Sequence, residues 1–150
     1  MTTATTTAPE TRRSRAPQRW LWAGLATTVL VTAGSLAASS VISDHVQASY
    51  PSFTAEEVGA ATTAYQVILL VVGLLGVGGW LVTLWGARRR ARWTTWVAVA
   101  LLLGALVVAV TGLTLQDTSG DVGLAPLQGW LQLAPCVVGA LAVASLWRRR

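Results

Sequence analysis

Four long segments without a charged residue limit what this chain of 150 residues can fold into. They cover residues 20–42, 58–87, 93–115 and 124–147. Each reaches the roughly 20 residues that a helix needs to cross a bilayer. The segments are rich in Leu, Ala, Val and Gly without strand-like alternation, so helices satisfy their backbone in lipid better than a barrel would. The sequence therefore predicts an all-α polytopic membrane protein with four transmembrane helices in an up-down bundle.

The placement of arginine predicts how these helices are oriented. All 11 basic residues are arginines. With four spans, all of them fall on the same side of the membrane: Arg12, Arg13, Arg15, Arg19, Arg88, Arg89, Arg90, Arg92, Arg148, Arg149 and Arg150. The two opposite loops carry only acidic charge, on Asp44, Glu56, Glu57, Asp117 and Asp121. Basic residues near short loops are retained in the cytoplasm. The protein is therefore expected in the cytoplasmic (inner) membrane, with both termini on its cytoplasmic side. The absence of Lys and Asn favours a GC-rich bacterial source.

Residues 1–18, rich in Thr, Ala and Pro, are expected to form a disordered basic cytoplasmic tail. Residues 19–150 are expected to form the transmembrane domain, with a small extracytoplasmic cap at about 43–60. The apolar run 20–42 exceeds the usual 7 to 15 residues of a signal peptide, so a retained anchor is expected. Small residues at positions 37–40 leave cleavage as an alternative.

The sequence pI of about 11.1 does not predict nucleic-acid binding, because the arginines adjoin helix ends and do not line one element's face. Anionic lipid headgroups are the expected partner of these charges. Most tryptophans lie within about a turn of an arginine, as indoles do at a membrane interface. Trp80 lies deeper and is expected to pack against a neighbouring helix.

The segment from Phe53 to Val58 predicts the start of the second long helix. Thr54 and Glu57 have the spacing of a capping box, in which each side chain accepts from the other residue's backbone N–H. Phe53 and Val58 hold the positions of a hydrophobic staple. About 33 residues follow from Ala55 to 87, or roughly 50 Å of helix, which exceeds a hydrocarbon core of about 30 Å. The helix is therefore expected to tilt or to project into the cap.

A divalent cation site is the alternative interpretation of these acidic residues. Asp44 and His45 belong to the same outer loop and could join Glu56 or Glu57, since carboxylate and imidazole ligands suit such ions. Nothing in the spacing requires a metal, and the capping interpretation is favoured.

Within the helices, small and polar residues predict contacts between spans. Gly73, Gly76 and Gly79 allow close helix approach, with packing inside the bundle favoured over a homodimer seam. An outer polar cluster of Gln66, Gln128 and Gln132 is expected to act as structural glue or to line a shallow vestibule. Pro135 is expected to kink the fourth helix, because it cannot donate to the carbonyl of residue 131.

No motif for catalysis, no cofactor site and no ionisable residue within a span is present. We therefore expect a non-enzymatic accessory or interaction subunit without a cofactor, with another membrane protein or further copies of itself as partner. An oligomeric carrier or channel for a small neutral or lipophilic solute, with Gln66, Gln128 and Gln132 at its mouth, is the first alternative. A cation-sensing module on the outer face is the second.

Overall fold

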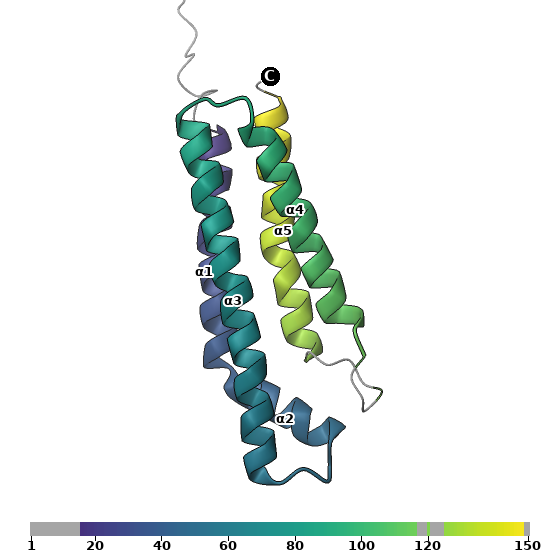
Figure 1. Ribbon diagram of the computed structural model, residues 1–150. Helices are drawn as coiled ribbons and strands as arrows, with labels where there is room; N and C mark the ends of the chain where they lie inside the picture. The colour runs from purple at the N-terminus through teal and green to yellow at the C-terminus, as the bar shows by residue number, and fades with distance from the viewer. Residues whose placement is uncertain (1–15, 117–119, 121–124, 149–150) are drawn as a thin grey trace, which may run out of the picture.

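The computed structural model describes residues 16–116, 120 and 125–148, which form a bundle of helices (Figure 1). The helices of this described part are α1 (Ala16–Ala37), α2 (Ser39–Ser49), α3 (Ala55–Arg88), α4 (Thr94–Thr114) and α5 (Pro126–Trp147). All but α2 are long and apolar enough to span a membrane. The predicted all-α fold with four candidate spans is thus confirmed. Of the tail expected over 1–18, residues 1–15 lie outside the described part, and residue 16 already begins α1.

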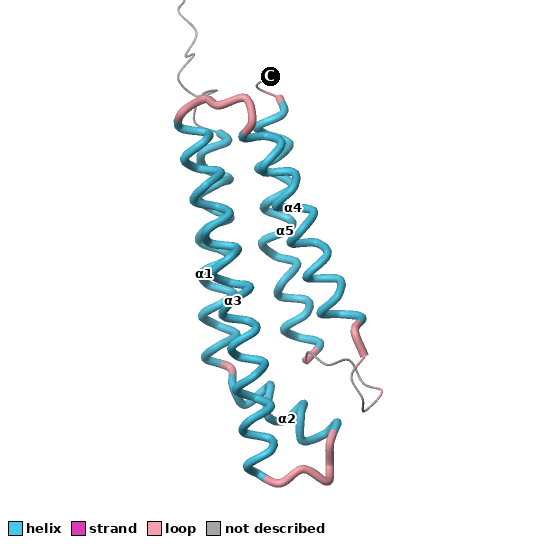
Figure 2. The backbone as a smooth tube through the Cα atoms, in the orientation of Figure 1, coloured by secondary structure: helices cyan, strands magenta, loops and turns pink. Residues whose placement is uncertain are grey.

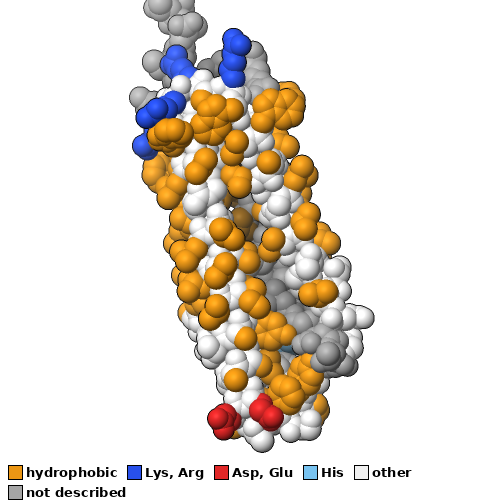
Figure 3. All heavy atoms as spheres, in the orientation of Figure 1, with side chains coloured by type: hydrophobic (Ala, Val, Ile, Leu, Met, Phe, Trp, Pro, Cys, Tyr) orange, Lys and Arg blue, Asp and Glu red, His pale blue; other side chains and the backbone are white. Residues whose placement is uncertain are grey.

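The four long helices lie side by side and alternate in direction (Figure 1). α1 contacts both α3 and α5 extensively, α4 packs on α5, and α3 touches α4 much less. Figure 3 shows basic side chains at one end of the molecule and acidic side chains at the other. We call the first the arginine end; its described arginines are Arg19, Arg88, Arg89, Arg90, Arg92 and Arg148. We call the second the cap end; its cap consists of α2, residues 50–54 and the first two turns of α3 (Figure 2).

The first span ends earlier than predicted, because α1 stops at Ala37 and not at residue 42. Ala38 leaves the helical conformation, and α2 begins at the next residue. Ile42 and Val46 lie one turn apart on α2 and are 2% and 3% exposed, buried in a cluster with residues 58 and 69 of α3. Residues 39–42 therefore belong to the cap, and much of the segment expected to be a loop is an amphipathic helix.

Trp80 joins three helices in the half of the bundle near the arginine end. Its indole N–H donates to Thr28 Oγ1 over 2.8 Å, and Thr28 Oγ1 donates to the carbonyl of Gly24 over 2.9 Å. A methyl group at Gly24 would overlap the indole ring. The ring packs on the buried cluster of Leu21, Leu84 and Ala142. Residues of α1, α3 and α5 thus meet at Trp80, and its predicted packing against a neighbouring helix is confirmed.

The three glycines singled out on α3 lie at contacts within the bundle. A methyl group at Gly73 would overlap the side chain of Thr32, and one at Gly76 would lie 3.0 Å from Thr28 Cγ2. One at Gly79 would lie 3.2 Å from Leu101 Cδ1 on α4. Two of these glycines therefore allow α1 to approach α3, and the third allows α4 to approach α3.

At the arginine end, α3 terminates in a Schellman motif. The N–H of Ala91 donates to the carbonyl of Gly86 over 3.1 Å, and the N–H of Arg90 donates to that of Ala87 over 3.2 Å. Arg90 has a φ of 52°, in the left-handed region that glycine usually occupies at this position. The motif turns the chain sharply, so the end of α3 and the start of α4 lie in contact.

Candidate functional site

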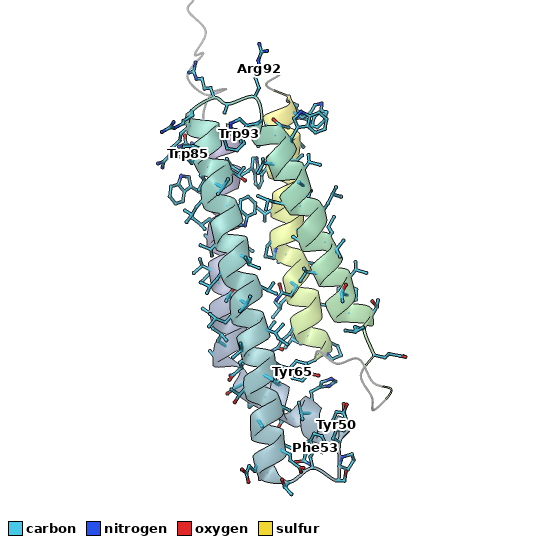
Figure 4. All side chains as sticks on the ribbon, in the orientation of Figure 1. Tyr50, Phe53, Tyr65, Trp85, Arg92 and Trp93 are labelled. Carbon is cyan, nitrogen blue, oxygen red and sulfur yellow. The ribbon has the colours of Figure 1, made fainter. Side chains whose placement is uncertain are left out.

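Aromatic and basic side chains form a belt around the arginine end (Figure 4). The guanidinium of Arg89 lies 4.3 Å from the centre of the Trp85 ring, and that of Arg88 lies 5.8 Å from the Trp22 ring of α1. The ring centres of Trp96 and Trp147, on α4 and α5, are 5.7 Å apart. Cation–π contacts of this kind at exposed sites contribute about 0.5–1 kcal/mol each. The belt therefore ties α1 to α3 and α4 to α5 at the arginine end.

The cap is a folded unit that extends the bundle at its other end. α3 has 34 residues, and at about 1.5 Å per residue it is roughly 51 Å long, well beyond a hydrocarbon core of about 30 Å. Tyr50 and Phe53 stack with ring centres 4.5 Å apart and an interplanar angle of 15° (Figure 4). The apolar cluster under them comprises Ile42, Val46, Val58 and Leu69. The cap therefore has a small core of its own, shared by α2 and α3.

A capping box fixes the start of α3, with Thr54 and Glu57 in the predicted roles. The N–H of Thr54 donates to Glu57 Oε2 over 2.7 Å, and the N–H of Glu57 donates to Thr54 Oγ1 over 3.4 Å. The Thr54 hydroxyl also donates to Glu57 Oε2 over 2.9 Å. Phe53 packs against the cluster that contains Val58, and its direct contact with Val58 as a hydrophobic staple stays a prediction. The carboxylate of Glu57 is thus engaged in starting the helix.

The cation site left open by the sequence does not form within the described residues. Asp44, His45, Glu56 and Glu57 are all described, yet no three His, Cys, Asp or Glu side chains in this part of the chain gather closely enough to hold a metal ion. Asp44 and Glu56 are exposed, and Glu57 bonds to Thr54. The geometry therefore gives the cation-sensing alternative no support.

The three glutamines of the predicted polar cluster differ in environment. Gln66 Nε2 donates to the backbone carbonyl of Leu36 on α1 over 3.4 Å, and so bonds to a neighbouring helix. Gln128 is 1% exposed, and neither atom of its side-chain amide has a hydrogen-bond partner. Gln132 is half-buried, and its backbone carbonyl accepts a hydrogen bond from the Cys136 thiol over 3.5 Å. α5 continues through Pro135, whose kink stays a prediction.

Ser35 is a further buried polar residue, which the sequence analysis did not place in the polar cluster. It is 2% exposed, near the end of α1, and its hydroxyl has no hydrogen-bond partner. A serine in an apolar helix gives little signal by itself, because its hydroxyl can donate to a carbonyl of the preceding turn, as Thr28 and Thr32 do here.

Comparison of the chain with protein-family models, with curated proteins and with solved structures gave no match in any of the three.

Proposed function

We propose that the chain is a non-enzymatic accessory or interaction subunit of the cytoplasmic membrane, with both termini inside and the cap outside. The separation of charge supports this orientation: basic side chains gather at one end and acidic side chains at the other (Figure 3). Asp44 belongs to α2, and Glu56 and Glu57 to the start of α3, at the cap end. Anionic headgroups of the inner leaflet are the proposed partners of the arginine end, at about 1 kcal/mol for each basic residue near the surface.

The observation that carries the proposal is the folded cap. Its core and the capping box hold α2 and the start of α3 in one arrangement, so its outer surface is preorganised for binding. Exposed residues of that surface are Ser40, Asp44, Gln47, Ser52 and Glu56. They provide hydrogen-bonding groups and negative charge without any basic group, which favours a polar or basic surface on a membrane protein partner.

The exposed middle of α4 supports a second contact with the same partner. Residues 103–108 are all exposed, and six consecutive residues exceed the 3.6 residues of one helical turn. Leu103 is 58% exposed and Val107 is 65% exposed. Leu102 still packs near Gly139 of α5 and Ala109 is buried, so the exposed surface lies on the side of α4 away from α5. This side leaves room for a helix of another membrane protein.

The test is affinity purification from the native membrane in mild detergent, with identification of bound proteins and native mass of the complex. We expect a stoichiometric membrane protein partner. Gln47→Arg and Ser52→Arg should together remove it, because they place positive charge on the cap surface. Gln116→Arg, in the other loop, is the matched control and should retain the partner. A homo-oligomer free of other proteins would contradict the accessory role and would make solute flux in liposomes the next measurement.

A further inference from the structure

Three buried polar side chains among the described residues have hydrogen-bonding groups without partners. Thr94 begins α4 at the arginine end, whereas Gln128 and Ser35 lie toward the cap end of α5 and α1. In Gln128 the groups without partners are both Oε1 and Nε2 of the amide, and in Ser35 the hydroxyl oxygen. The two residues are 1% and 2% exposed. Buried polar groups in proteins are nearly always hydrogen-bonded, because removing them from water is otherwise costly. These three atoms therefore require an explanation.

The packing of α1 on α5 brings the two residues to one level. The helices run in opposite directions and share a buried cluster through Leu21 and Ala142 (Figure 1). Ser35 is fourteen residues after Leu21 (35 − 21), and Gln128 is fourteen residues before Ala142 (142 − 128). Both displacements therefore run about 21 Å toward the cap end, at 1.5 Å per residue. Fourteen residues are close to four full turns, so each residue also returns to the same side of its helix.

The surroundings specify a neutral and small occupant. The neighbouring residue Leu36 already accepts a hydrogen bond from Gln66, so three helices contribute polar groups at this level. None of these groups is ionisable. The next residue on α5 is Gly129, where a methyl group would lie 2.6 Å from Leu113 Cδ2, so the surrounding helices are closely packed. A primary amide offers two donor hydrogens and an acceptor oxygen, and a serine hydroxyl both donates and accepts.

We propose that Ser35 and Gln128 form an internal binding site for a small neutral molecule that both donates and accepts hydrogen bonds. Water has this chemistry, as does a small solute with a hydroxyl or amide group. Buried waters typically make two to four hydrogen bonds to polar groups of this kind. The site lies in the seam between α1 and α5 and is independent of the proposed interaction role.

The test is NMR spectroscopy of the full chain in lipid nanodiscs with ¹⁵N-labelled glutamine. Gln128→Leu identifies the side-chain resonances of Gln128, and those of Gln66 serve as an internal reference. We expect a direct cross-peak between the Gln128 amide protons and water, or a saturable shift of these protons on addition of acetamide or glycerol. The first result identifies water as the occupant, and the second identifies a solute site.

Ser35→Ala keeps the size of the core and provides the second variant. It should weaken the Gln128 water cross-peak, or the apparent affinity for the added solute, at least two-fold while leaving the Gln66 resonances in place. The proposal is overturned if the Gln128 amide contacts neither water nor added solute, or if Ser35→Ala leaves its response unchanged. A direct hydrogen bond between Ser35 and Gln128, seen as loss of one amide shift in the variant without any water or solute contact, would also overturn it.

Discussion

Replacing Gly24 by alanine should disrupt the junction at Trp80. The added methyl group would overlap the indole ring, which cannot retreat while its N–H remains bonded to Thr28. Overpacking in a close-packed core costs about 1–3 kcal/mol. Loss of the Trp80 hydrogen bond adds about 0.5–1.5 kcal/mol. The expected cost is therefore about 1.5–4.5 kcal/mol before any change in helix propensity.

Gly78→Ala is the matched control, because a methyl group at Gly78 would meet no other atom within 4 Å. Both variants exchange glycine for alanine inside a helix, so the intrinsic gain of about 1 kcal/mol largely cancels between them. Reversible unfolding in mixed detergent micelles, followed by far-UV circular dichroism, measures the difference. Gly24→Ala should be less stable than Gly78→Ala by about 3 kcal/mol from the sum above. Equal stability of the two variants would refute the role assigned to the Gly24–Trp80 contact.

Four further predictions concern the two ends of the molecule. Arg90→Gly should stabilise the protein by about 1 kcal/mol, because glycine adopts the left-handed conformation at less cost; an unchanged unfolding midpoint would contradict this. Thr54→Ala should cost about 1 kcal/mol through loss of the helix cap. Glu57→Gln should cost less, and equally with and without divalent cations; a loss of stability seen only with added cation would contradict the capping role. In a chain whose native cysteine is replaced, a cysteine at Ser52 should react with an impermeant maleimide in intact cells, and one at Ala91 only after permeabilisation. The reverse pattern would invert the proposed orientation.

The sequence predicted the spans and the start of α3 because those features depend on local chemistry. Long uncharged runs and the Thr54–Glu57 spacing can be recognised without knowing what packs against them. The end of α1 was missed for the opposite reason. Hydropathy assigned Ile42 to the membrane, whereas in the structure its side chain is buried in the cap against α3. Apolar composition alone does not distinguish a residue that faces lipid from one that faces protein.

The buried polar residues show that sequence is equally limited in predicting contacts between helices. The sequence grouped Gln66, Gln128 and Gln132 because they share a depth and a chemical type. Their actual environments depend on the rotation of each helix, which places Gln66 against the Leu36 carbonyl and buries Gln128 without a partner. The register of α1 on α5, which residues such as Leu21 and Ala142 fix, is what brings Ser35 to the depth of Gln128. The depth of a residue along its span can be predicted from the sequence. The helix or lipid that its side chain faces is known only from the packed bundle.

The contacts between α3 and α4 determine where a partner would fit. Near the arginine end they approach closely, with Gly86 against Thr94 and Gly79 against Leu101. Beyond Leu101, residues 103–108 are all exposed, whereas Ala109 is buried and Leu113 packs against Gly129 of α5. The exposed stretch therefore lies in the middle of α4, between the arginine end and the cap, and a single membrane partner lying along α4 would reach both this stretch and the cap. Paired substitutions, one on each surface, should then weaken the same complex, whereas changes at the arginine end should leave it intact.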